Sequence, residues 1–463
     1  MAFIGKDVPA QNSPALVAGA GLYTGDVKLD HMAYAHIVRS PFAAARILSI
    51  DASAALALPG VICVVTGEDL KARDYAMPVE GFGEGASMKP FELYPLAVGH
   101  IRYAGESVAA VVADSPYTAK QAAMLVDVDY EERDPVVDPA RGLEPDSPLV
   151  EEGWGSNVLF QTRMQSGNME EVLRNAARKV GGELHHHRYT GAAMEPRAYV
   201  ADWDAHRQTL KFWASTQCPH PMRTQLAETL HLAENSIQVI QPNVGGAFGL
   251  KIPAFQEEAL TAALSIISGR PVRWVAERRE DLLAGGHARE GKFTWEAAYE
   301  ADGLVTALKV RYVADVGAPS GLAGWGQSYV TGFAIPTVYK IRDTDVEVIA
   351  VATNKCPWNA YRGFGKESSS GCTRLGQDLV LAVPIVTDRG CAYERLWRAL
   401  DLCEGLCKKT GRVDSAVPDQ RLLSGRPPGI GDILSRKVDH DVKPLKPPCV
   451  YLLMCRIPED LVR

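Results

Sequence analysis

The chain has 463 residues, of which 46% are hydrophobic and 23% are charged, and its formal net charge is −7. This length predicts about three domains of roughly 150 residues each, and the composition is ordinary for a globular protein. The acidic balance argues against a nucleic acid partner, and the longest uncharged run, residues 316–339, is broken by glycines, prolines and polar residues and will not span a membrane.

The first part of the chain predicts an extended lead-in followed by an α/β domain. Residues 1–20 are polar and rich in Pro and Ala, whereas residues 21–134 contain several apolar runs typical of strands and one with the period of a helix. The strands are expected at 32–38, 45–50, 61–65, 107–113 and 126–130, and the helix at 118–125. Prolines and acidic residues in residues 135–150 then predict a linker.

A second domain, residues 151–366, is predicted to have a mixed α/β fold with antiparallel strand pairs. Hairpins are expected around the turns at 204–207 and 301–303, because alternating apolar residues flank turn-forming ones. The expected strands are 199–203, 209–213, 293–299 and 304–313, and the expected helix is 222–232. This pattern differs from a doubly wound sheet, in which parallel strands alternate with helices.

A glycine-rich loop lies at the centre of the second domain. The stretch Gly245-Gly-Ala-Phe-Gly-Leu-Lys251 joins an expected strand at 237–240 to an expected helix at 253–268, which Gly269 ends. Glycines there allow positive φ and the close approach of a ligand, and free N–H groups at a helix start favour an anion. Many such turns carry glycine only for packing, so the loop alone leaves both interpretations open.

Two nucleotide-binding motifs do not fit this loop. In a P-loop, Ser or Thr follows the lysine and binds Mg²⁺, but here Ile252 follows Lys251. A dinucleotide-binding fingerprint needs a different glycine spacing inside an early βαβ unit.

Three separated motifs resemble the xanthine dehydrogenase/aldehyde oxidase family of molybdenum hydroxylases. The loop is similar to the family's molybdopterin-cofactor loop, with Ala247 in place of a glycine. The other two motifs, in the family's order, are Ala214-Ser-Thr-Gln217 and Ala360-Tyr-Arg-Gly-Phe-Gly365. Three motifs in the right order are far more specific than one.

The resemblance also covers the first domain. This domain resembles the family's N-terminal hammerhead domain in three short stretches, Tyr23–Asp26, Arg39–Pro41 and Val126–Tyr130. The fold implied is therefore α+β: an α/β hammerhead domain, then a mixed α/β molybdopterin-binding domain, then an irregular C-terminal tail.

The resemblance implies a role for each matched site residue. The amide of Gln217 would donate to an oxygen ligand of molybdenum; the alternative is a turn residue that caps the next helix. Arg362, expected to be buried, and Phe364 would lie at the substrate face; the alternative is an Arg paired with a local carboxylate. Phe248 would form an apolar wall beside the metal, with core packing as its alternative. Besides Gln217 and Arg362, the positions expected to hold the cofactor are Gly245, Gly246, Ala247, Phe248 and Gly249.

Two other candidates are expected to be structural. His185, His186 and His187 are consecutive and would point to alternate faces of a strand, so they cannot all ligate one metal ion and are expected on the surface. Glu195 belongs to a family-like block and is expected in an ion pair rather than as a catalytic base.

The family pattern stops after Lys366, and residues 367–463 are expected to form a divergent, poorly ordered tail. The family continues into a long helix there, whereas this chain continues with Glu367 and three serines. An out-of-frame reading would produce such a junction, and a genuine divergent segment remains the alternative. The pair Cys403 and Cys407 has no second pair of ligands and is not expected to bind metal.

The function implied is that of a molybdopterin-binding large subunit that oxidises an aldehyde or an N-heterocycle. The chain as written is expected to be incomplete and inactive, because the family's base carboxylate lies in a C-terminal half that the resemblance does not reach. Purine-hydroxylating members carry Glu where Ile252 stands, and members that oxidise carbon monoxide carry Cys where Gly363 stands. The alternative is a truncated, non-catalytic pseudo-subunit that at most docks a partner.

The cofactor implied is molybdenum–molybdopterin, in its cytosine dinucleotide form. Iron–sulfur and FAD cofactors are expected on partners, an iron–sulfur small subunit and an FAD-binding medium subunit, because this chain has no iron–sulfur cysteine spacing. The chain does not begin with the pattern of a secretion signal, and the few cysteines before residue 370 do not have the spacing of disulfide or zinc-binding pairs. A cytoplasmic location is therefore expected.

Overall fold

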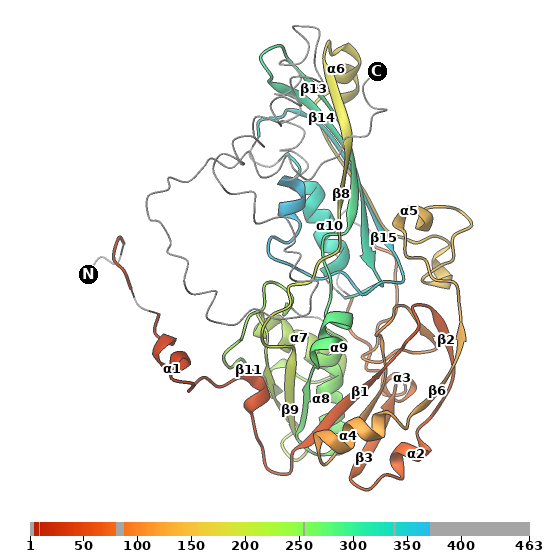
Figure 1. Ribbon diagram of the computed structural model, residues 1–463, viewed down its shortest axis with the longest axis vertical. Helices are drawn as coiled ribbons and strands as arrows, with labels where there is room; N and C mark the ends of the chain where they lie inside the picture. The colour runs from red at the N-terminus through yellow and green to blue at the C-terminus, as the bar shows by residue number, and fades with distance from the viewer. Residues whose placement is uncertain are drawn as a thin grey trace, which may run out of the picture. The chain divides into compact units, whose positions relative to one another are not determined.

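The computed structural model describes residues 4–8, 10–79, 88–252, 255–321, 323–336 and 339–370 (Figure 1). The strands of these residues form a seven-stranded, a five-stranded and a three-stranded sheet. Helices pack on the faces of the sheets, so the α+β class predicted from the sequence is confirmed.

The seven-stranded sheet combines strands from both predicted domains. Its order is β11-β10-β9-β12-β1-β5-β3. The strands are β1 (Ala33–Arg39), β3 (Val61–Thr66), β5 (Ser107–Ala113), β9 (Ala198–Asp204), β10 (Thr209–Ala214), β11 (Ile237–Ile240) and β12 (Val272–Val275). β1 connects the two groups, since it runs antiparallel to β5 and parallel to β12, where Ala33 pairs with Val272.

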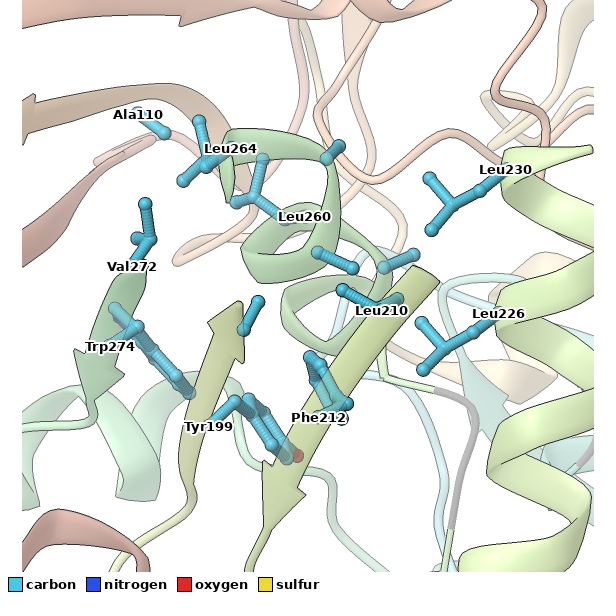
Figure 2. Packing of buried hydrophobic residues seen from close by; sticks show 14 of the residues in the cluster. Ala110, Tyr199, Leu210, Phe212, Leu226, Leu230, Leu260, Leu264, Val272 and Trp274 are labelled. Carbon is cyan, nitrogen blue, oxygen red and sulfur yellow. The ribbon is translucent and has the colours of Figure 1, made fainter. Parts of the chain in front are cut away.

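The main hydrophobic core lies between this sheet and the helices α7 (Pro219–Leu230) and α8 (Gln256–Ser268). Figure 2 shows leucines of α7 and α8 in one cluster with Tyr199, Phe212 and Trp274 of the strands. The ring of Tyr199 stacks between the other two, with centroids 5.8 and 5.6 Å away. Because side chains alternate along a strand, the opposite face of the sheet packs against α2 (Ser53–Leu56) and α4 (Pro116–Ala123).

The five-stranded sheet has the order β7-β15-β14-β13-β8. Its strands are β7 (Val158–Ser166), β8 (Lys179–His186), β13 (Gly291–Tyr299), β14 (Val305–Gly317) and β15 (Asp343–Ala352). Only the β14–β15 pair is parallel. The helix α10 (Ala323–Phe333) lies beside β15 (Figure 1), and α6 (Met169–Asn175) packs on β14 and β15.

The three-stranded sheet, β4-β2-β6, has its own small apolar cluster around Ala45 and Ile101. Its strands are β2 (Ala45–Asp51), β4 (His100–Ile101) and β6 (Asp127–Glu132). Further α-helices among the described residues are α1 (Ser13–Val17), α3 (Gly67–Lys71), α5 (Pro139–Gly142) and α9 (Arg278–Ala284), and residues 366–370 are helical as well. Three single 3₁₀ turns lie at Thr24–Asp26, Glu152–Trp154 and Glu234–Ser236.

The predicted strands and helices are found in the structure, with shifted ends. The helix expected at 118–125 starts at Pro116, because Ser115 caps it by accepting a hydrogen bond from the N–H of Thr118. The helix expected at 253–268 starts at Gln256, and residues 253–254 lie outside the described part of the chain. The pattern did not predict β4, β7, β8, β12 or β15.

A buried ion-pair network links β1 to α8. The Arg39 guanidinium donates to Glu257 at 2.7 Å and to Glu280 at 2.6 Å, and Arg197 donates to Glu257 at 2.7 Å. Burial alone would raise the pKa of the Glu257 carboxyl, but the two guanidinium groups more than offset this and hold the pKa at about 2. The network holds the start of α8 against the first part of the chain.

The described structure continues for four residues past Lys366, where the tail was expected to begin. Ser368 and Ser369 are 1% and 0% exposed, and Ser368 Oγ lies 3.1 Å from Nδ1 of His186. Glu367 forms an ion pair with Arg289. Residues 371–463, including Cys403 and Cys407, lie outside the described residues.

Candidate cofactor-binding site

The loop Gly245–Lys251 follows β11 and turns sharply at its tip. The φ angle is +98° at Gly246, +55° at Phe248 and +100° at Gly249. A phenylalanine rarely adopts positive φ, which costs on the order of 1 kcal/mol or more. Its side chain is 46% exposed, so Phe248 is not part of the core. Strain of this kind persists only where the surroundings enforce it.

Glu195 fastens both ends of the loop. Its Oε2 accepts hydrogen bonds from the N–H of Gly245 at 2.8 Å, from Lys251 Nζ at 2.9 Å and from Ser215 Oγ at 2.6 Å. Lys251 is 2% exposed, and burial lowers the pKa of its ammonium group, an effect that Glu195 partly opposes. The predicted ion pair of Glu195 is therefore present, and Lys251 points into the fold rather than toward a ligand.

Gln217 is bonded to the loop from the other side. Its Oε1 accepts from the N–H of Gly249 at 2.8 Å, and its own N–H donates to the carbonyl of Lys251 at 2.9 Å. The next helix, α7, has Cys218 at its N-cap and no side-chain cap, so the capping alternative for Gln217 is not observed. Because Oε1 of Gln217 accepts hydrogen bonds from the loop, the Nε2 of the same amide points its N–H groups elsewhere and can donate to another group.

The third motif lies directly against the loop. The N–H of Arg362 donates to the carbonyl of Phe248 at 2.8 Å. A Cβ added to Gly249 would lie 2.9 Å from the carbonyl carbon and oxygen of Ala360, so only glycine allows this approach. The structure therefore brings Gln217, the loop and Arg362 together on one face, although they are far apart in sequence.

Two expected details of the site are wrong. Arg362 is exposed rather than buried, and it makes no ion pair with any described residue. The loop does not open directly into a helix, since α8 begins five residues after Lys251. The N–H groups of Gly245 and Gly249 already donate hydrogen bonds within the fold. In the described structure of the loop, the N–H groups of residues 246–248 are the only ones that have no acceptor.

Arg289 is a site neighbour that the sequence did not indicate. It precedes β13, has a φ of +74°, and donates through Nη2 to the carbonyl of Arg362 at 2.9 Å. It stands in no matched motif, and an Arg between a polar turn and a strand has no distinctive pattern. Only the folded chain shows that it touches the third motif.

The histidine triplet is divided between two faces, as strand geometry requires. His185 and His187 are exposed, as expected, with ring centroids 5.2 Å apart. His186 is not on the surface: it is half-buried against the ring of Phe293, and burial lowers the pKa of its imidazole to about 4. Among the described residues, no group of three or more His, Cys, Asp or Glu side chains could hold a metal ion.

Within the described residues, no helix combines the length and the hydropathy needed to cross a bilayer.

The fold is that of a molybdopterin-binding subunit, and comparison with known families agrees. Residues 150–372 match the molybdopterin cofactor-binding domain, and residues 18–134 match the aldehyde oxidase and xanthine dehydrogenase a/b hammerhead domain. The chain belongs to the xanthine dehydrogenase/aldehyde oxidase family of molybdenum hydroxylases, whose members are oxidoreductases. The family predicted from the three motifs is confirmed.

Several relatives are similar over most of this chain. The nicotine 6-hydroxylase large subunit of Paenarthrobacter nicotinovorans is 36% identical over 78% of this chain and 44% of its own length. The nicotinate dehydrogenase large molybdopterin subunit of Eubacterium barkeri is 28% identical over 80% of this chain and 83% of its own length. The crystal structure of quinoline 2-oxidoreductase from Pseudomonas putida 86 superposes with a TM-score of 0.74 at 34% identity, covering 82% of this chain and 50% of that one.

Against the nicotine 6-hydroxylase subunit and the quinoline enzyme, this chain spans about half the relative's length. Against the Eubacterium subunit it spans most of the length.

Proposed function

We propose that this chain supplies one side of a molybdenum–molybdopterin site that oxidises an aldehyde or an N-heterocycle. The observation that carries the proposal is the single face formed by Gln217, the Gly245–Gly249 loop and Arg362. Family membership supports the cofactor class, and the names of the nicotine and quinoline relatives favour an N-heterocycle over an aldehyde.

The groups left on this face fit an anionic cofactor rich in acceptors. They are all donors: the N–H groups of residues 246–248, the Nε2 of Gln217 and the exposed guanidinium of Arg362. The glycines at 246 and 249 have positive φ, which lets a ligand approach the backbone closely. Among the described residues, no carboxylate accepts a hydrogen bond from these donors.

Each residue has a distinct role in this proposal. Gln217 would donate a hydrogen bond to the cofactor, because its oxygen is held by the loop. Phe248 would exclude water on one side, and Arg362 and Phe364 would contact the substrate. When bound, the molybdenum cofactor would supply the two-electron oxidation of a substrate carbon.

The finer features of the complex follow from the family. We propose the cytosine dinucleotide form of the cofactor, an iron–sulfur small subunit, an FAD-binding medium subunit and a cytoplasmic location. The base carboxylate is expected in the part of the longer relatives that this chain does not match. Without that part we expect no turnover, because a missing general base alone costs roughly 10²–10⁴-fold in rate.

The extent of the Eubacterium subunit bears on how such a site is completed. Because this chain covers 83% of that subunit's length, a molybdopterin subunit of similar extent exists in the family. We propose that the remaining donors and the base come from a separate polypeptide or from further sequence of the same protein. The alternative remains a non-catalytic module that docks a partner without holding the cofactor.

Molybdenum and pterin content tests the proposal directly. The full chain is expressed in a molybdenum-replete host with iron–sulfur and FAD subunits of a related enzyme, and metal per folded chain is measured by mass spectrometry. We expect molybdenum and pterin in the purified protein, reduced by Arg362→Ala but not by the control Arg207→Ala in the exposed hairpin turn. A folded chain with neither would contradict the proposal and favour the non-catalytic module.

A further inference from the structure

The turn that carries Arg362 has a backbone conformation that its own hydrogen bonds hold weakly. φ is +137° at Gly363, +55° at Phe364 and +92° at Gly365. The bond from Phe364 N to the carbonyl of Tyr361 is 3.4 Å long, and that from Lys366 N to the carbonyl of Gly363 is 3.3 Å. Three consecutive positive φ angles, one at a phenylalanine, need support from outside the turn.

Arg289 supports the carbonyl side of the turn. Its Nη2 donates to the carbonyl of Arg362 at 2.9 Å and lies 3.4 Å from that of Tyr361. Its guanidinium carbon lies 4.6 Å from the ring centroid of Tyr361 and 5.9 Å from that of Tyr189. The guanidinium plane is thus held by two rings while its fork is aimed at the turn.

Glu367 closes the other end of the turn. Its Oε1 lies 2.8 Å from Nε of Arg289. Its Oε2 lies over Gly363, where an added Cβ would be only 2.0 Å away. Neither oxygen accepts a hydrogen bond from a described residue, so the charge of Arg289 is what compensates this buried carboxylate.

We infer that Arg289 and Glu367 form a clasp that holds the turn 361–365, and that Arg289 is a positioning residue for Arg362 and Phe364. The inference rests on the proposed function, since it concerns how the same site is shaped. Arg289 occupies the carbonyl side of the turn and leaves the Arg362 side chain exposed. Because the N–H of Arg362 is bonded to Phe248, the clasp also fixes the turn against the loop.

The chemistry of the clasp requires arginine at this position. A lysine would keep the positive charge but lose the planar fork and most of the stacking on Tyr361. Arg289→Lys should therefore retain the ion pair with Glu367 and still loosen the carbonyl contacts. Glu367→Gln should keep the size of the side chain and remove its charge.

Hydrogen–deuterium exchange on the full chain without added cofactor tests the clasp. In Arg289→Ala we expect amides of 361–368 and of 246–249 to exchange about tenfold faster or more, since a charge-assisted hydrogen bond and an ion pair are lost. Arg289→Lys and Glu367→Gln should give smaller increases in the same peptides. Lys292→Ala, which removes an exposed ion pair with Glu183 on the neighbouring strand, should change nothing there.

Two results would overturn the inference. One is unchanged exchange at 361–368 in Arg289→Ala and Glu367→Gln. The other is a uniform rise across the chain, which would make Arg289 a residue of global stability only. If Arg289→Ala fails to fold, the exchange of the same peptides in Arg289→Lys and Glu367→Gln tests the inference instead.

Molybdenum content separates this inference from the proposed function. If wild type carries molybdenum, folded Arg289→Ala should lose most of it, whereas Lys292→Ala should keep it; equal content in both would count against the positioning role. If wild type carries none, the proposed function fails, while the exchange data still establish or refute the clasp.

Discussion

At Gly249 the Gly245–Lys251 loop packs directly against the backbone of Ala360 and Tyr361, at the start of the Arg362 turn. Its φ of +100° disfavours any side chain, and the backbone of Ala360 leaves no room for a Cβ. Gly269, at the end of α8, also has positive φ, at +65°, but no atom lies within 4 Å of an added Cβ. Alanine substitution at the two glycines therefore distinguishes the free-energy cost of the positive φ from the cost of the contact with Ala360.

Gly249→Ala is expected to destabilise the chain by roughly 1 kcal/mol for conformation and by about 1–3 kcal/mol more for the displaced backbone. Gly269→Ala should show only the first cost. Urea unfolding of both variants measures the difference. Equal costs would mean that the loop and the turn can separate freely, which would contradict their tight packing at Gly249.

At this scale the sequence predicted which residues meet but not how they are held. Gln217, the loop and Arg362 were expected at one site because their motifs are matched as a set. The positive φ of Phe248 and Phe364 could not be expected, since the residue type itself disfavours it. Arg289 and the exposure of Arg362 depend on contacts between segments far apart in sequence, which no local pattern records.

The helix α8 begins with two adjacent buried carboxylates in opposite states. Glu257 faces two guanidinium groups and stays ionised. For Glu258, burial raises the pKa from 4.5 to about 8, although hydrogen bonds from the Tyr199 hydroxyl and the N–H of Phe255 oppose the shift. The first turn of α8 thus holds one charged and one neutral carboxyl at neutral pH.

Glu258→Gln should change how stability depends on pH. The folded pKa of Glu258 lies above the unfolded one, so its stabilising contribution is complete below about pH 4.5 and is lost as the pH rises through about 8. Glutamine stays neutral, so the variant should gain on wild type by an amount on the order of a few kcal/mol between pH 5 and pH 8. Denaturant unfolding across this range, with exposed Glu228→Gln as control, measures it; parallel curves for Glu258→Gln and wild type would contradict the assignment.

Elements with a strong local period were predictable, and those defined by pairing were not. The hairpin at 301–303 and α8 follow from alternation and from the 3.6-residue period. β8 contains two glycines that lower strand propensity, and it exists because β13 pairs along its whole length. β12 has only four residues and is defined by its neighbours β1 and β9.

The described chain is connected through the sheet shared by its two predicted domains rather than through the linker at 135–150. β1 pairs with β12, Arg39 bonds to Glu257 and Glu280, and the amide of Asn354 donates to the carbonyl of Arg102. These contacts do not depend on an intact linker. The domain boundaries expected from the sequence stay a prediction, because these contacts do not test where one domain ends and the next begins.

Cutting the linker should therefore not separate the two segments. A protease site inserted beside exposed Pro145 and cleaved in the folded full chain should give two bands under denaturing conditions but one peak in size-exclusion chromatography. The uncut protein with the same insertion is the control for the elution volume. Two separate peaks after cleavage would show that the shared sheet does not hold the segments together.

The shared sheet also sets an order of events during biosynthesis. Arg39 and its partner Glu280 are 241 residues apart. β1 likewise cannot pair with β12 until a similar length of chain has been synthesised. At ribosomal rates of roughly 5–20 residues per second, the first segment spends on the order of ten to fifty seconds with one edge of β1 unpaired and Arg39 without its carboxylates. During that interval the nascent chain presents an open strand edge, which is the kind of surface that molecular chaperones protect. Variants that slow the formation of β12 should therefore reduce the yield of folded protein in cells more than they reduce its stability once folded.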